Sequence, residues 1–333
     1  MSSSALPGTA DLEGGLPSGL RAGLRVIAPA KLNLALEVLG RRRDGYHDID
    51  TVMTTIDLAD ELRLRPHPTL EVTYDGAYAR GLASIEAGSD LVTRAALALA
   101  TAAGFEPRAR IEVTKRIPHP AGLGGGSSDA AAALRGLNAL WGLDWPAARL
   151  AEVAATIGSD VPFFVHGGNA HCTGRGEVVE PLRDLPELRV LVLVPPVPPR
   201  ENKTARRYAD LIRTDFSDGE RAQRLAYRVA RGAPPPARDL YNTFEAVIER
   251  TDFELMGHFA AYRAAGAPTL HLCGAGPAAF LFVSERAKVS ELRHQFREAG
   301  AEVIEARTLR RAAALKLEPL DAPARPDTPT SED

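Results

Sequence analysis

Hydrophobic and polar positions alternate over the first patterned stretch of the chain, residues 25–40. Lys31 and Asn33 are two residues apart, so they point to the same side of an extended segment. The other side is apolar and carries Leu32, Leu34, Leu36 and Val38. The pattern predicts a strand whose apolar side packs in a core and whose polar side faces a cleft.

Strand-like and helix-like segments are interleaved along the rest of the chain. Further strands are predicted at residues 61–65, 70–74, 110–117 and 188–194, in a hairpin over 169–182 that turns at Gly174–Gly176, on both sides of residues 274–277, and near Glu302. Helices are predicted at residues 90–103, with Ser89 as N-cap and Gly104 as stop, at 127–141, at 146–157, as several amphipathic segments up to about 266, and from Ser284 onwards. This mixture predicts an α+β protein.

The two ends of the chain lack any period. Residues 1–24 are rich in Ser, Gly, Ala and Pro, residues 319–333 are rich in Pro and polar groups, and both are predicted to be disordered tails. A change of character between about residues 170 and 186 predicts two domains, residues 25–180 and 181–318.

Composition narrows the functional classes. The 333 residues include 40 Lys and Arg against 43 Asp and Glu, a formal net charge of −3, which argues against a nucleic-acid-binding protein. No apolar run approaches the ~20 residues that cross a bilayer, and the N-terminus does not resemble a signal peptide. Cys172 and Cys273 are far apart in the sequence, form no metal or disulfide pattern, and are expected to be buried. A cytoplasmic protein without a membrane partner is expected.

A glycine-rich loop carries the clearest chemical signal. Residues 118–129 read PHPAGLGGGSSD and separate a predicted strand from an Ala-rich helix. Glycines let backbone N–H groups approach a ligand, and a helix N-terminus favours anions, so together they predict a phosphate-binding loop. The loop matches neither GxxxxGK[ST] nor GxGxxG. The alternative is a flexible strand-to-helix connection in which a serine caps the helix.

Three segments in order resemble the motifs of the GHMP kinases. They are Ala28–Leu34 (APAKLNL), Pro118–Leu134 (PHPAGLGGGSSDAAAAL) and Leu272–Pro277 (LCGAGP), and the similarity covers about residues 25–318. The resemblance implies an N-terminal ATP-binding domain like ribosomal protein S5, a ferredoxin-like C-terminal domain, and an active site in the cleft between them. It also implies ATP and Mg²⁺ as cofactors, the metal arriving with ATP and with Ser128 as its candidate protein ligand.

Asp44-Gly45-Tyr46-His47 and Gly158–Phe164 (GSDVPFF) narrow the resemblance to the branch of this family whose acceptor is a cytidine-diphosphate-linked methylerythritol. That branch transfers the γ-phosphoryl group of ATP to the 2-hydroxyl of the erythritol in non-mevalonate isoprenoid biosynthesis. Another GHMP kinase, of the homoserine or mevalonate type, is the alternative within enzymes. A nucleic-acid-binding module and an inactive small-molecule sensor are the alternatives from other classes.

The resemblance assigns Lys31 and Asp160 to catalysis. A carboxylate beside the acceptor hydroxyl accepts or orients its proton, and a neighbouring ammonium keeps that carboxylate ionised. Taken singly, Lys31 is also compatible with a lysine at a strand edge, and Asp160 with a turn residue that caps locally.

Binding residues follow from the same resemblance. The loop residues expected to bind the ATP phosphates are Pro118, Gly122, Leu123, Gly124, Gly125, Gly126, Ser127 and Ser128. Those expected to bind the acceptor are Asn33, Tyr46, His47, Thr204, Tyr208, Gly274 and Gly276. A solvated hairpin would also explain Tyr46 and His47, and burial of an amphipathic helix would also explain Tyr208. Ala275 stands where the family usually has serine, so any side-chain contact there is in doubt. The protein is expected to be a monomer or a homodimer.

Overall fold

A computed structural model describes residues 22–80, 88–198, 202–267, 269–284, 286 and 288–320. Most of the two predicted tails lies outside these residues. Residues 22–24 of the first tail and 319–320 of the second lie inside, and at Leu24 and Pro319, which are strand residues, the prediction of disorder is wrong. Leu24 pairs with Pro319 in neighbouring antiparallel strands, so both ends of the described chain belong to the same sheet.

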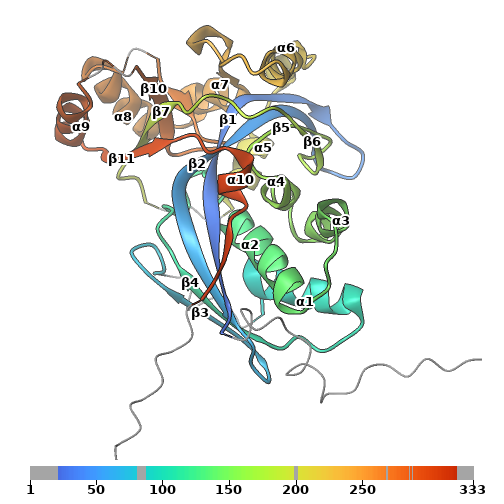
Figure 1. Ribbon diagram of the computed structural model, residues 1–333. Helices are drawn as coiled ribbons and strands as arrows, with labels where there is room; N and C mark the ends of the chain where they lie inside the picture. Colours follow the sequence, from blue (N-terminus) through green and yellow to red (C-terminus); the bar gives the residue numbers. More distant parts are fainter. Residues whose placement is uncertain are drawn as a thin grey trace, which may run out of the picture.

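The larger sheet is formed mainly by the first half of the chain. Among the described residues it has eight strands, with the path β12-β1-β2-β4-β3 and with β5, β6 and β8 attached to it. Its strands are β1 (Leu24–Arg41), β2 (His47–Arg65), β3 (Leu70–Asp75), β4 (Ala109–Thr114), β5 (Asn169–Thr173), β6 (Val178–Pro181), β8 (Tyr241–Asn242) and β12 (Leu317–Pro319). Long β1 and β2 form a bent antiparallel hairpin that runs through the molecule (Figure 1).

Four helices pack on one face of this sheet (Figure 1). They are α1 (Leu91–Ala103), α2 (Gly125–Leu140), α3 (Ala147–Ile157) and α4 (Val161–His166). The central helix α2 is rich in alanine, and Ala130–Ala133 are fully buried. Small side chains bring α2 close to β1, and Gly136 has no room for a Cβ, which would lie 2.9 Å from a Leu64 methyl.

The second half of the chain forms a smaller sheet with its own helices. Its described strands follow the order β11-β7-β10-β9. They are β7 (Arg189–Val194), β9 (His271–Leu272), β10 (Ala279–Val283) and β11 (Glu302–Arg307). The helices are α5 (Lys203–Ala209), α6 (Glu220–Ala230), α7 (Thr243–Thr251), α8 (Phe253–Ala264), α9 (Val289–Glu298) and α10 (Arg311–Ala314). Leu32 and Leu34 of β1 share an apolar cluster with Val192 and Phe280, so the two sheets are joined by a common core.

The α+β class and most predicted elements are confirmed, but several boundaries are wrong. Asp90, not Ser89, caps α1, since its carboxylate accepts from the Thr93 amide at 2.9 Å. Helix α2 begins two residues before Ser127, without any side-chain cap. The helix expected from Ser284 begins only at Val289, the first position whose side chain is buried in the core. The domain boundary at residue 180 stays a prediction.

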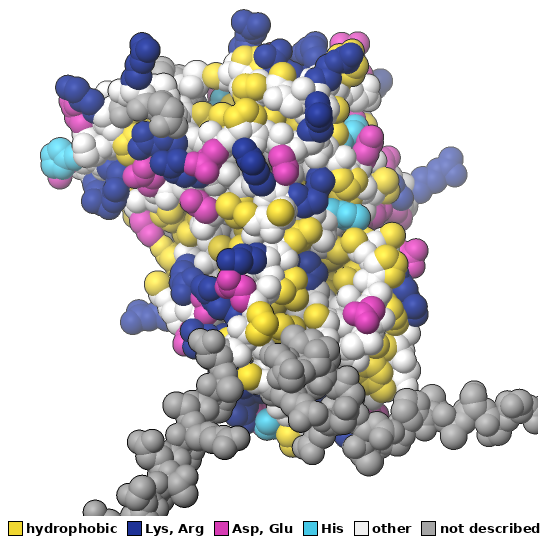
Figure 2. Space-filling model, viewed as in Figure 1, with side chains coloured by type: hydrophobic (Ala, Val, Ile, Leu, Met, Phe, Trp, Pro, Cys, Tyr) yellow, Lys and Arg dark blue, Asp and Glu magenta, His cyan; other side chains and the backbone are white. Residues whose placement is uncertain are grey.

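The face shown in Figure 2 carries both signs of charge. Basic and acidic side chains are interspersed over its described surface, and hydrophobic atoms lie between them. Helix α6 illustrates the pattern, because its exposed side combines Glu220 with basic residues such as Arg221 and Arg228. No described helix is long and apolar enough to cross a membrane.

Candidate active site

Backbone contacts bring the three sequence motifs together. The Lys31 amide donates to the Leu123 carbonyl at 2.9 Å, which joins β1 to the glycine-rich loop. The Ala278 amide donates to the Ala121 carbonyl at 3.2 Å, which joins the same loop to the third motif. A Cβ on Gly122 would lie 1.9 Å from the Cys273 carbonyl oxygen. The motifs therefore form one continuous wall, and this contact requires glycine at position 122.

The loop approaches α2 through glycines with left-handed backbone. Gly124, the N-cap of α2, has φ of +76°, and no side chain caps the helix there. A Cβ on Gly124 would lie 2.8 Å from the Phe164 ring and 3.0 Å from Cγ of Lys31. The first-turn amides of α2 are thus left without a side-chain acceptor, as a phosphate-binding helix N-terminus requires.

The two serines of the loop have different environments. Ser127 is half-buried in the first turn of α2. Ser128 is fully buried, and its hydroxyl donates to the Pro29 carbonyl at 2.7 Å. The expectation that Ser128 binds phosphate or metal is therefore contradicted, because its side chain is enclosed between α2 and β1. The expectation that Ser127 makes such a contact stays a prediction.

Lys31 lies at the centre of the wall. Its side chain is only 5% exposed, and its amine donates to Oδ1 of Asn33 at 2.6 Å. Nδ2 of Asn33 donates to the Thr51 hydroxyl at 2.9 Å, and that hydroxyl donates to the Ala35 carbonyl at 2.6 Å. This chain of hydrogen bonds holds the amine in place, so Lys31 is not a lysine at a solvated strand edge.

Asp160 faces Lys31 from a different part of the fold. It stands at the N-cap position of α4, yet its side chain makes no capping hydrogen bond. Its Oδ2 lies 3.9 Å from Nζ of Lys31, and its side chain is 36% exposed. The alternative of a local cap is thus excluded. The Asp160 carboxylate is partly exposed to solvent and also faces the Lys31 amine.

The third motif closes the site beside Lys31. A Cβ on Gly274 would lie 3.0 Å from the Lys31 amine. The loop is held by Asn242, whose Nδ2 donates to the carbonyls of Leu272 at 3.0 Å and Gly274 at 2.8 Å. Asn242 was missed by sequence reasoning, because its only local signal is an N-cap pattern before α7. Ala275 is buried, in keeping with a backbone role for this loop.

Aromatic side chains gather beyond the start of β2. The His47 ring stacks on Tyr208 of α5, with centroids 5.0 Å apart, and Phe216 lies 6.1 Å away. Burial, and to a smaller extent Arg41, lowers the pKa of His47, which favours the neutral ring. Tyr46 is 54% exposed and lies against the Arg175 guanidinium. The predicted Thr204 is also exposed, on the same short helix as Tyr208.

A buried cluster of charged residues, which the sequence did not reveal, lies next to the glycine-rich loop and stabilises it. The Lys115 amine donates to the carboxylates of both Asp60 and Asp129, the latter in the first turns of α2. Asp60 also accepts from the Ile117 amide at 2.8 Å. Burial, together with the neighbouring Asp60, raises the pKa of Asp129 to about 8 although Lys115 opposes the shift. One ammonium thus ties β2, β4 and the phosphate loop together.

His171 and the two cysteines are further titratable groups near the site. His171 contacts Asp50 at 2.6 Å, and this hydrogen bond raises the pKa of the imidazole. Both cysteines are free and buried, as expected, and burial raises the pKa of Cys273 to about 12. Among the described residues, no three His, Cys, Asp or Glu side chains form a metal-binding group.

Fold and site together define a GHMP-type kinase, and comparison with known proteins agrees. The GHMP kinases N terminal domain matches residues 90–168. The 4-diphosphocytidyl-2-C-methyl-D-erythritol kinase of Dehalococcoides mccartyi is 37% identical over 281 residues, which cover 83% of this chain and 95% of that protein. The kinase of the same name from Shouchella clausii is 36% identical and covers 85% of this chain and 93% of its own.

Solved structures give the same result. A crystal structure of 4-(cytidine 5'-diphospho)-2C-methyl-D-erythritol kinase matches with a TM-score of 0.69 and 32% identity, covering 85% of this chain and 98% of that one. A homoserine kinase from Cytophaga hutchinsonii matches with a TM-score of 0.68 at 16% identity, over 90% of this chain and 98% of its own, which shows a shared fold. The chain belongs to the 4-diphosphocytidyl-2-C-methyl-D-erythritol kinase family.

Proposed function

We propose that this protein transfers the γ-phosphoryl group of ATP to the 2-hydroxyl of 4-diphosphocytidyl-2-C-methyl-D-erythritol. The observation that carries the proposal is the open Asp160 carboxylate, 3.9 Å from the buried Lys31 amine and next to the glycine-rich loop. Sequence identity of 36–37% to kinases of that name, over most of the chain, supports the same acceptor.

In the proposed reaction, Asp160 binds the acceptor hydroxyl and accepts or orients its proton. Lys31 stabilises the carboxylate and the negative charge near the transferred group. Asn33 receives one hydrogen of the ammonium and so fixes its direction. Phosphoryl transfer depends on alignment and charge neutralisation more than on covalent chemistry, which suits such a rigid arrangement.

The donor phosphates would bind the loop of Gly122–Ser127 and the N-terminal amides of α2. The hydroxyl of Ser127 is a hard oxygen, a donor type that Mg²⁺ accepts, and it is the loop side chain we assign to a metal that arrives with ATP. When bound, Mg²⁺ neutralises charge on the β- and γ-phosphates.

The base of the acceptor would bind where His47, Tyr208 and Tyr46 lie. A pyrimidine needs an aromatic face and paired donors and acceptors on its edge, and a neutral imidazole has one of each. A homoserine or mevalonate acceptor has no base for this cluster to recognise. Mixed surface charge on the face in Figure 2 gives no support to the nucleic-acid alternative.

The test incubates the purified protein with ATP, Mg²⁺ and each of three acceptors, and follows ADP release and the phosphorus NMR spectrum. We expect turnover only with the cytidine-diphosphate-linked acceptor and a new phosphomonoester signal. Equal or faster turnover of homoserine or mevalonate would exclude the proposed acceptor.

Two variants test the assigned groups. Asp160→Asn and Lys31→Ala are each expected to lower kcat by about 10²–10⁴-fold, the range of general acid–base effects. Asp160→Asn should leave the fold intact, because Asp160 makes no capping contact. Lys288→Ala, at an exposed lysine, is the control. If both active-site variants keep wild-type kcat and lose only thermal stability, both residues are structural.

A further inference from the structure

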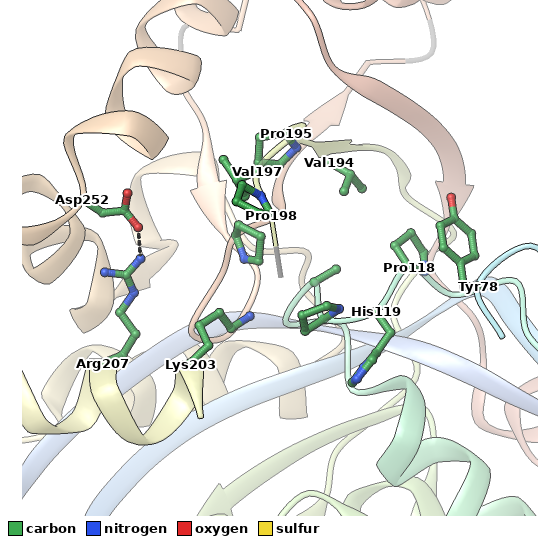
Figure 3. A pocket seen from close by; sticks show the side chains of 13 residues that line it. Tyr78, Pro118, His119, Val194, Pro195, Val197, Pro198, Lys203, Arg207 and Asp252 are labelled. Carbon is green, nitrogen blue, oxygen red and sulfur yellow. Dashed lines mark hydrogen bonds and ion pairs between the residues drawn. The ribbon is translucent and has the colours of Figure 1, made fainter. Parts of the chain in front are cut away.

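A second lysine, Lys203 of α5, lies close enough to Lys31 for the two charges to interact. Lys203 lines a cavity of about 130 Å³, open to solvent, between the start of the glycine-rich loop and the loop after β7. Figure 3 shows its amino group pointing into this cavity, with Pro118 and His119 on another wall.

Lys203 lacks a counter-charge among the described residues. Its neighbour one turn along, Arg207, is turned to Asp252 and forms an ion pair with it (Figure 3). Arg207 and Asp252 line the same cavity, yet neither gives Lys203 an acidic partner, because that carboxylate already serves the guanidinium. A partly desolvated ammonium without a partner is costly in a folded protein unless a ligand completes the site.

The position of Lys203 links it to the motif wall. Burial, followed by repulsion from Lys31 and Arg207, lowers the pKa of Lys203 to about 8. The charge of Lys203 also acts on His119 of the loop, whose pKa is lowered by burial and then by Lys115 and Lys203. It acts on Cys273 of the third motif as well, where it opposes the rise in pKa that burial causes. The charge of Lys203 is therefore close enough to influence a group in each of the three motifs.

Resting on the proposed function, we propose that Lys203 binds phosphate oxygens in the cleft and forms, with Lys31, a pair of lysines that grips the phosphate chain. Lys31 faces the Asp160 carboxylate, and Tyr208, which lies on the same helix as Lys203, stacks on His47. The oxygens belong either to the donor triphosphate or to the diphosphate of the acceptor. A dianion beside Lys203 replaces the missing counter-charge and favours the ammonium form.

The proposal predicts a pH dependence of binding. Above pH 8 the free protein holds Lys203 increasingly as a neutral amine, so phosphate affinity should fall by up to about tenfold per pH unit. The charged and titratable groups that face Lys203 are Lys31 on β1, Arg207 on α5, Asp252 before α8, His119 in the loop and Cys273 in the third motif. Arginine at position 203 should remove this dependence, because its charge is permanent.

The experiment compares Lys203→Met, Lys203→Arg and the control Arg206→Met, which removes a cation from the exposed side of the same helix. Calorimetry measures the binding of ADP and of CDP separately at pH 7 and pH 9. Steady-state kinetics then gives KM for each substrate.

We expect Lys203→Met to weaken binding of one nucleotide, and to raise KM for the matching substrate, by at least about tenfold. The nucleotide affected identifies the source of the phosphate. Lys203→Arg should bind as the wild type does at pH 7 and keep that affinity at pH 9. Thermal stability of Lys203→Met should be unchanged or higher, since the charge removed has no counter-charge among the described residues.

Affinities of Lys203→Met within twofold of wild type for both nucleotides, with both KM values unchanged, would overturn the proposal. An equal loss of affinity in Arg206→Met would also overturn the proposal, because the loss would then follow from removing any positive charge from α5. Failure of the proposed function looks different: the wild type would not turn over the cytidine-diphosphate-linked acceptor, whereas binding measurements on Lys203 would still be decisive.

Discussion

The buried side chain of Asn242 caps a helix with its oxygen and holds the third motif with its nitrogen, and substitutions can separate these two roles. Its Oδ1 accepts from the Phe244 amide at 2.9 Å and so caps α7. Its Nδ2 donates to two carbonyls of the third motif, at 3.0 and 2.8 Å. Only 2% of the residue is exposed, so water does not readily replace these bonds.

Asn242→Ser keeps a capping oxygen but is too short to reach the loop. Two lost hydrogen bonds at ~1 kcal/mol each, plus carbonyls left unsatisfied, predict a loss of about 2–4 kcal/mol in the free energy of unfolding. Asn242→Ala also loses the cap, which adds ~1 kcal/mol. Because Gly274 lies against the Lys31 amine, a shift of ~1 Å in the loop should lower kcat/KM by about 100-fold in both variants.

Urea unfolding followed by circular dichroism gives the stability changes, and steady-state kinetics gives kcat/KM. Asn138→Ser is the matched control, because Asn138 also bonds two backbone groups of Trp145, within the helical layer. It should lose stability and keep kcat/KM. The reasoning is refuted if Asn242→Ser retains wild-type kcat/KM, or if the serine and alanine variants are equally stable.

Three further predictions follow from local geometry. Gly122→Ala should lose far more stability and activity than Gly45→Ala: both glycines have positive φ, but only the first Cβ would meet another backbone atom. Ser128→Ala should cost about 1–3 kcal/mol in unfolding experiments, whereas Ser127→Ala should mainly raise KM for ATP. The raised pKa of His171 means that its ion pair stabilises the fold below about pH 6.5 and less as pH rises. The stability difference between wild type and His171→Asn, measured by urea unfolding, should therefore shrink from pH 6 to pH 9; a constant difference would contradict it.

Much of the local structure was predictable because it depends on neighbours in the chain. The alternation of polar and apolar residues predicted that Lys31 and Asn33 lie on the same side of a strand, and the structure shows a hydrogen bond between them. Glycine density between residues 122 and 126 indicated close backbone approach, and the structure shows which backbone is approached. Errors arose where two candidates stood side by side, as with Ser89 and Asp90, because the cap is decided by which side chain reaches the Thr93 amide.

By itself, then, the sequence determined the periodicity of the elements, the order of the motifs and the kinds of groups available for chemistry. Tertiary structure decided which of those groups are exposed and what each one faces. Ser128 became a buried link, Asn242 became the anchor of a distant loop, and Lys203 was brought within range of the charge of Lys31. The physical reason is that burial and charge pairing depend on residues far apart in the chain, which only the packed fold brings within a few ångströms.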